Sequence, residues 1–248
     1  MKPPSEEIIA YRALSLGALI SRGEIEHKLY KIDDDDERSD EIEELKNQAA
    51  ELSDWLEREQ LKDHLSVQEC ELFEKKPGSW KRQAMINAGW RTESLGTLLW
   101  VLSYLEEIPP YDTEFKVGPV LDELGVLMSS RCFMQCTLIR PTGEIRRVRE
   151  VAELWHWRSR TSRLMQQDAK SGQNVRVTGA IQEVAQHAYL GQSIPRPIQG
   201  DFPAFGKPYV ALSPSEFAKA TSIAFERHYA LNWVCGYSDD WDRTPTDT

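Results

Sequence analysis

Cysteine is scarce in this sequence of 248 residues, and the four that occur follow no disulfide pattern. They are Cys70, Cys132, Cys136 and Cys235. This excludes a small secreted domain held together by disulfides. Cys132 and Cys136 would share one face of a helix, as two metal ligands can. A structural zinc site needs four ligands, however, and His156 and His187 are the only other candidates close in sequence. We therefore expect buried, apolar thiols, no metal and no other cofactor.

Long apolar runs are also missing. The most apolar internal stretch, residues 95–105, is interrupted by Gly96, Thr97 and Ser103. A membrane-spanning helix needs about 20 apolar residues, so this stretch is too short. The N-terminus shows no secretory signal, because Arg12 interrupts its apolar segment. These features predict a soluble protein of the reduced cytoplasm, with no membrane partner.

Positive charge is in short supply. The chain has 30 Lys and Arg against 40 Asp and Glu, which gives a net charge of -10. A surface this acidic repels a phosphate backbone, which argues against nucleic acid as a partner. Six arginines lie near Trp155 and Trp157, as in helices that contact nucleic acid, but glutamates lie among them. We favour a solvated helix face that pairs with acidic neighbours such as Asp33–Asp36. The six are Arg146, Arg147, Arg149, Arg158, Arg160 and Arg163.

What the chain does have is helical periodicity nearly throughout. Hydrophobic residues make up 40% of it, which is enough for a substantial core. The pattern predicts an all-α fold, a single irregular domain over residues 1–248 with roughly seven to nine helices. Residues 131–140 fit a strand or a helix, and we favour the helix. The other expected helices cover residues 5–21, 40–61, 67–76, 79–107, 118–128, 142–170, 178–190 and 213–235.

Several helix ends carry local signals. Ser5 precedes two glutamates and should cap the first helix, because acids in a first turn oppose the helix dipole. Ser66 and Ser213 each precede a glutamate by three residues, which is the spacing of a capping box. Gly23 should follow the end of the first helix. Pro109 should lie beyond the end of the helix that begins at residue 79.

Three segments lack the helical pattern. An acidic insertion covers residues 33–44, and like charges in a row favour an exposed loop. Residues 191–212 are rich in proline and glycine, so we expect an ordered or mobile surface loop, more mobile than the helices it joins. The tail, residues 237–248, is polar and acidic, and Trp241 should pack it against the body. Its alternating acids lack the glycine and terminal glutamate of a calcium loop.

Five groups of residues resemble a known family. They are Tyr11–Leu14, Ser53–Glu59 with Leu65–Ser66, Gly89–Leu95 continued by Leu98–Trp100, Glu226–Trp233, and Asp240–Thr248. Together they resemble the family catalogued as domain of unknown function 4272. The strongest motifs are Trp-Arg-x-Glu, within the segment that begins at Gly89, and Glu-Arg-His-x-Ala-Leu-Asn-Trp, which begins at Glu226. The resemblance implies a mostly helical, cytoplasmic protein and supplies no activity, substrate or catalytic residue.

Two polar residues lie on otherwise apolar helix stripes, which places them toward the interior. Arg91 heads one stripe, and a withdrawn guanidinium needs an acceptor because an unpaired buried charge is costly. Glu226 is the first choice of partner, and Glu93 or an aspartate of the tail is the next. His228 lies on the stripe of the last helix, where it could act as acid or base in a small polar pocket. We favour instead a structural network that fixes the helix register. The catalytic candidates are His228, Glu226, Arg91 and Glu93.

Catalytic sequence signatures are missing as well. The chain has no phosphate-binding glycine loop, dinucleotide fingerprint, serine-hydrolase elbow or zinc-protease motif. Together with the net charge of -10, this favours a non-catalytic protein-binding module that captures a basic protein partner, for example an immunity or inhibitor protein. The alternative is an enzyme that uses the polar pocket. The binding candidates are Arg227, Asn232, Trp241 and Asp242.

Overall fold

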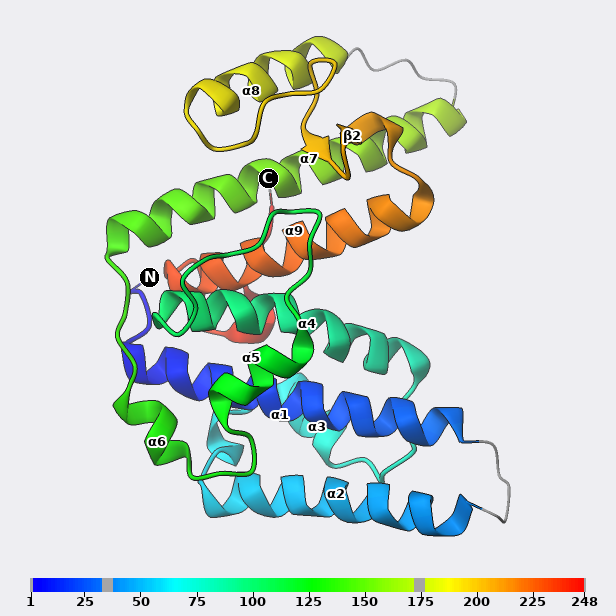
Figure 1. Cartoon of the computed structure of the whole chain (residues 1–248), viewed down its shortest axis with the longest axis vertical. Helices are drawn as coiled ribbons and strands as arrows, with labels where there is room; N and C mark the ends of the chain where they lie inside the picture. Colours follow the sequence, from blue (N-terminus) through cyan, green and yellow to red (C-terminus); the bar gives the residue numbers. More distant parts are fainter. Residues whose placement is uncertain (1, 33–37, 172–176, 248) are drawn as a thin grey trace.

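The computed structural model describes residues 2–32, 38–171 and 177–247. Within these ranges the chain forms nine α-helices and one antiparallel two-stranded hairpin, which confirms the predicted all-α fold (Figure 1). No helix in these ranges is both long and apolar enough to cross a membrane. The elements are α1 (Glu6–Lys31), α2 (Ser39–Arg58), α3 (Val67–Phe73), α4 (Arg82–Val101), α5 (Val117–Leu124), α6 (Ser130–Gln135), α7 (Thr142–Ser171), α8 (Thr178–Leu190), β1 (Pro203–Ala204), β2 (Lys207–Pro208) and α9 (Pro214–Val234).

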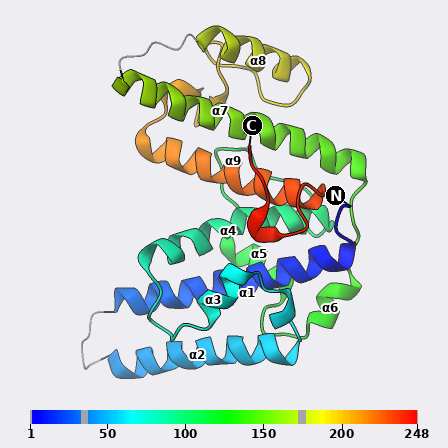
Figure 2. The same ribbon diagram turned by 180° about the vertical axis from the view of Figure 1, so that it is seen from behind.

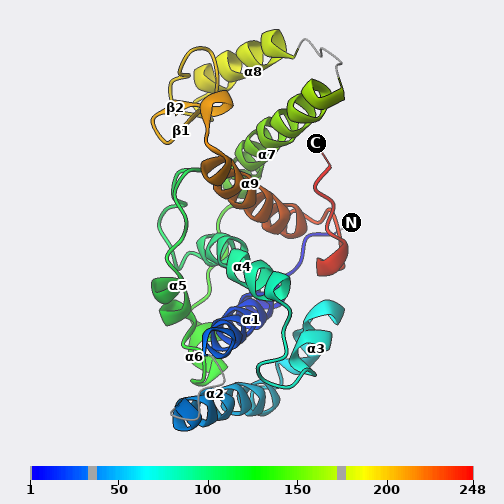
Figure 3. The ribbon, with the colours of Figure 1, turned by 90° about the vertical axis from the view of Figure 1, so that its right-hand side faces the viewer.

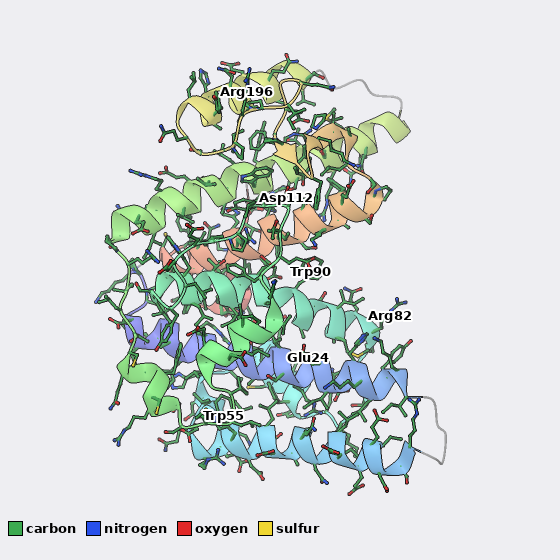
Figure 4. All side chains as sticks on the ribbon, viewed as in Figure 1. Glu24, Trp55, Arg82, Trp90, Asp112 and Arg196 are labelled. Carbon is green, nitrogen blue, oxygen red and sulfur yellow. The ribbon has the colours of Figure 1, made fainter. Side chains whose placement is uncertain are left out.

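The five long helices form a stack in the order α2, α1, α4, α9 and α7 (Figure 1). α8 and the hairpin lie beyond α7, and Figure 3 shows α3 on one side of α1 with α5 and α6 on the other. One hydrophobic cluster contains buried residues of α1, α2, α4, α7, α8 and α9. Trp55, labelled on α2 in Figure 4, belongs to this cluster and donates its indole N–H to the carbonyl of Met128. A core shared in this way is what a single domain would show, and the single domain over residues 1–248 stays a prediction.

α1 lies inside the stack, and more than half of its 26 residues are buried. The predicted end near Ser21 is wrong, because the helix continues to Lys31. Gly23 is not a stop signal. A Cβ at Gly23 would lie 2.8 Å from the Cβ of Ala88 on α4, so glycine is needed for the close approach of the two helices.

The bounds predicted for α4 are too wide. It begins at Arg82 because the carboxylate of Glu26 accepts the backbone N–H groups of Gly78 and Trp80, which holds that segment outside the helix. It ends at Val101, and Ser103 then adopts a left-handed conformation with φ 63° that an α-helix cannot continue.

Some of the other predicted helix boundaries agree with the structure and some do not. Ser5, Ser66 and Ser213 cap their helices as predicted, the last two with complete capping boxes. α8 has the predicted bounds, and α7 has them within one residue. α5 is shorter than predicted because Gly125 ends it in a left-handed conformation. For residues 131–140 the preference for helix is confirmed only in part, since α6 ends at Gln135.

The segment 191–212 is largely irregular, as expected for a loop, but it does not lie wholly on the surface. It carries the hairpin, and Phe202, Ala204 and Tyr209 are buried in the main core. A hydrogen bond also connects this segment to the loop before α5. There Asp112 (labelled in Figure 4) accepts the backbone N–H of Phe205 at 2.8 Å. This segment is therefore part of the packed structure.

Two further expectations about exposure are wrong. Cys132 and Cys136 are exposed, because the short helix α6 buries Phe133 instead. Among the six arginines expected on a solvated face of α7, Arg158 is fully buried, whereas Arg146, Arg147, Arg160 and Arg163 are exposed as expected. No group of three or more His, Cys, Asp or Glu residues in the described ranges is arranged to hold a metal ion.

The predictions for the acidic insertion and for the tail differ in how they compare with the structure. Asp33–Asp36 lie outside the described residues, and the acidic residues from Asp40 onward belong to α2 rather than to a loop. In the tail, Trp241 is 5% exposed and packs edge-on against Tyr229 and Trp233. The prediction that Trp241 packs the tail against the body is confirmed.

Candidate functional site

A cleft of about 340 Å³ lies between α4, α7 and α9. We call it the arginine cleft, because three of its lining side chains are arginines. Trp90, labelled on α4 in Figure 4, and Phe225 on α9 supply aromatic surface. Its charged and ionisable residues are Arg91 on α4, His156, Arg160 and Arg163 on α7, and Glu226 on α9.

Arg91 and Glu226 form an ion pair at one side of the cleft. The Arg91 Nη1 group donates to Oε2 of Glu226 at 3.0 Å, and the Ser94 hydroxyl donates to the same oxygen at 2.6 Å. The Arg91 side chain is 21% exposed and that of Glu226 is 8% exposed. Burial opposes the charge on Arg91, but the neighbouring Glu226 outweighs it and raises the pKa of the guanidinium. The first-choice partner predicted for Arg91 is confirmed.

Glu93 does not reach the arginine cleft. Its carboxylate accepts Arg227 Nε at 2.8 Å and the backbone N–H of Phe115 at 2.8 Å. Arg227 is fully buried and also donates to carbonyls of the loop before α5, those of Pro109 and Thr113. Burial raises the pKa of Glu93, while Arg227 opposes the rise. This pair ties α4 and α9 to the loop and faces away from Glu226.

His228 also lies outside the cleft, behind His156. The two Nδ1 atoms are 3.2 Å apart, so one ring donates a hydrogen bond to the other. His228 is 0% exposed and His156 is 5% exposed. The structure brings Arg91 and Glu226 together, but Glu93 and His228 join neither them nor each other.

Both histidines are held in the neutral form. Burial lowers the pKa of His156 to about 4, and the charges of Arg160 and Arg163 add to the effect. Burial lowers the pKa of His228 to about 3, with further contributions from His156 and Arg149. Because a pKa that low leaves a weak base, neither ring is suited to take a proton at neutral pH.

The C-terminal tail meets the cleft at Arg160. The Nη1 atom of Arg160 lies 3.5 Å from the carbonyl oxygen of Thr246 and 3.6 Å from Oδ1 of Asp247. Further back, the Asn232 side chain donates to the carbonyl of Pro245 at 2.8 Å. Figure 2 shows the tail in red alongside α9. The tail therefore brings a carboxylate to one edge of the arginine cleft.

The predicted binding residues occupy four different settings. Arg227 is buried beside Glu93, and Asn232 bridges Arg149 on α7 to the tail. Trp241 is buried in the aromatic cluster of the tail, while Asp242 accepts the backbone N–H of Gln68 at 3.1 Å. They form no common surface, and a binding role for them stays a prediction.

Three residues of α7 that line the cleft belong to none of the predicted catalytic or binding sites. His156, Arg160 and Arg163 are spaced by four and three residues, which places them on one face of α7. That spacing is a usable signal of a shared face, but by itself it does not distinguish a cleft wall from the solvated face expected for these arginines. Nothing local in the sequence indicates that this face meets Trp90 or Phe225.

Comparison with known proteins gives a family but no relative of known function. No curated protein and no solved structure matches the chain. The sequence profile described as Domain of unknown function (DUF4272) matches residues 1–180, which include α4 and α7 but not α9. The resemblance of the segment Glu226–Trp233 to that family thus lies outside the matched range. On the match over residues 1–180, the chain belongs to the DUF4272 family.

Proposed function

We propose that this protein is a non-catalytic binding module, and that its arginine cleft receives the anionic group of a ligand. The observation that carries the proposal is the charge of the cleft. Arg160 and Arg163 face the cavity in addition to Arg91, whose charge Glu226 already balances. Guanidinium groups recognise carboxylates and phosphates through paired N–H donors, and the surrounding aromatic walls strengthen the attraction by excluding water.

The setting of the histidines supports binding over catalysis. A catalytic pocket needs an acid or base with a pKa near the working pH. The pKa of His156 is lowered to about 4, and His228 behind it is fully buried. The alternative of an enzyme with a polar pocket built from Arg91, Glu93, Glu226 and His228 is therefore the weaker hypothesis.

The predicted basic protein partner would bind the outer, acidic surface of the molecule rather than the arginine cleft. The net charge of -10 still favours such a partner, and an immunity or inhibitor role is one form of it. The arginine cleft has the opposite sign and would hold the acidic part of a ligand. A location in the reduced cytoplasm belongs to the same proposal, since the four cysteines are free thiols and two of them are exposed.

Calorimetric titration at low salt with inorganic pyrophosphate and, separately, with citrate tests the proposal. The two probes distinguish a phosphate from a carboxylate ligand. We expect saturable binding of at least one probe, weakened about tenfold by Arg163→Gln, because a charge-assisted hydrogen bond contributes about 1.5–3 kcal/mol. Arg147→Gln is the matched control, since Arg147 is an exposed arginine of the same helix that does not line the cleft.

The outcomes separate the two functions. Absence of saturable binding with both probes, or an equal loss in the Arg147 variant, would overturn the anion-binding cleft. Phosphorus NMR of the pyrophosphate mixture checks for turnover. Release of orthophosphate that is lost in the His228→Gln variant would favour the enzyme instead.

A further inference from the structure

Arg160 belongs to two structures at once, the arginine cleft and the contact with the tail. The carboxylate of Asp247 lies 3.6 Å from its Nη1 atom, and the Asp247 side chain is 97% exposed. The Arg160 side chain is itself 44% exposed. The tail thus offers Arg160 a carboxylate, the chemistry that the cleft is proposed to recognise in a ligand.

The tail is firmly held just upstream of this contact. Trp241 is buried, and Asn232 donates to the carbonyl of Pro245 at 2.8 Å. Only Thr246 separates Pro245 from Asp247, so the anchored carbonyl keeps the carboxylate in the neighbourhood of Arg160. A tethered group of this kind acts at a millimolar effective concentration, which lets a weak contact compete with a free ligand.

We infer that Asp247 is an internal competitor for the arginine cleft, displaced from Arg160 when an anionic ligand binds. This inference rests on the proposed function, because it names the regulation of the same site. Two anions cannot share the outward side of one guanidinium without repulsion. Because the Asp247 contact is exposed and single-pronged, a ligand that engages Arg91 or Arg163 as well displaces it readily.

The test compares two asparagine variants of the full chain by titration with inorganic pyrophosphate at low salt. Asp247→Asn removes the competing charge. Asp239→Asn removes one charge from the same tail at an exposed residue with no contact to Arg160 in the described structure. We expect Asp247→Asn to bind pyrophosphate about two- to fivefold more tightly than the wild type, the range for releasing an exposed ion pair. The Asp239 variant should bind like the wild type.

Two additional conditions check the assignment to Arg160. The gain from Asp247→Asn should disappear when Arg160 is replaced by Gln in the same chain, because the competitor then has no partner. The gain should also shrink at high salt, where exposed charges are screened.

Each result decides between the two proposals. Binding by the wild type, with the Asp247 and Asp239 variants equal, overturns the internal competitor and leaves the anion cleft standing. No binding by any of the variants overturns the cleft and the competitor together. Binding by the Asp247 variant alone supports a competitor strong enough to close the cleft.

Discussion

Arg158 and Asp201 form a two-pronged ion pair between α7 and the segment that carries the hairpin. The Nε and Nη2 groups of Arg158 donate to the two carboxylate oxygens at 2.6 and 2.7 Å. Both side chains are buried, and Asp201 also accepts the backbone N–H groups of Phe202 and Val210. Each charge of this pair has its counter-charge and hydrogen-bond partners in the interior. Removal of one partner therefore leaves an unpaired buried charge.

Replacing Asp201 by Ala should therefore destabilise the protein by about 3–5 kcal/mol, the scale for breaking a buried pair. Urea denaturation measures the loss. Limited proteolysis should also shift, with early cleavage within residues 191–212 in the variant but not in the wild type. Asp239→Ala is the control, because it removes an exposed aspartate. Early cleavage of that segment in the wild type would contradict the anchoring role of Asp201.

Replacing Arg91 by Ala should cost about 2 kcal/mol, because Glu226 keeps the hydrogen bond from Ser94 but loses its counter-charge. Arg91→Lys should cost about half as much, since a point charge restores the attraction without the planar geometry. The free energy of unfolding in urea gives both values. Arg82→Ala, at an exposed arginine in the first turn of α4, should change stability by only a few tenths of a kcal/mol. Equal effects at both arginines would mean that the pair with Glu226 contributes nothing.

Stability should decrease as the pH falls below 6.5, the ordinary pKa of histidine. The folded-state pKa values are about 4 for His156 and about 3 for His228, so the unfolded state binds more protons between those values and 6.5. Each histidine then costs up to about 1.4 kcal/mol per pH unit in this window. Arg160, Arg163 and Arg149 lie near the pair and oppose protonation, whereas Asp247 favours it.

Urea denaturation at several pH values between 7 and 4 measures this dependence. The His228→Gln variant should lose less stability on acidification than the wild type, because it lacks one of the two titrating rings. His27→Gln is the control, since His27 is exposed on α1. An identical slope in the wild type and the His228 variant would show that the buried pair does not govern the acid sensitivity.

Two glycines of α4 should respond oppositely to alanine. A Cβ at Gly96 would lie 2.5 Å from the ring of Phe115, whose backbone N–H is bonded to Glu93. Gly96→Ala should destabilise the protein by about 1–3 kcal/mol through overpacking. A Cβ at Gly89 meets nothing within 4 Å, so Gly89→Ala should stabilise by about 0.5–1 kcal/mol. Thermal unfolding of both variants checks the sign of each change.

Local signals in the sequence predict local structure well in this protein. The capping boxes at Ser66 and Ser213 form as predicted, because the interacting groups are three residues apart. The prediction that Arg91, Glu93, Glu226 and His228 share one polar pocket is wrong for a geometric reason. Residues two apart on a helix point about 200° apart, so Arg91 and Glu93 face opposite sides of α4, as Glu226 and His228 do on α9.

The structure of the segment 191–212 could not be predicted for a different reason. Its anchor Asp201 pairs with Arg158, which is 43 residues away and lies in a run of similar arginines. Nothing in the composition marks that arginine as the buried one. The arginine cleft shares this property, because it depends on how α7 packs across α9.

The central position of α1 has a consequence for synthesis of the chain. α1 leaves the ribosome before α2 and α4, and α2 can cover one of its sides soon afterwards. Its contact with α4 cannot form until residues 82–101 have emerged. At about 5–20 residues per second, the side of α1 that packs on α4, with the Arg22–Glu26 ion pair, stays uncovered for several seconds. During that time the nascent chain exposes apolar residues of α1 that the folded protein buries.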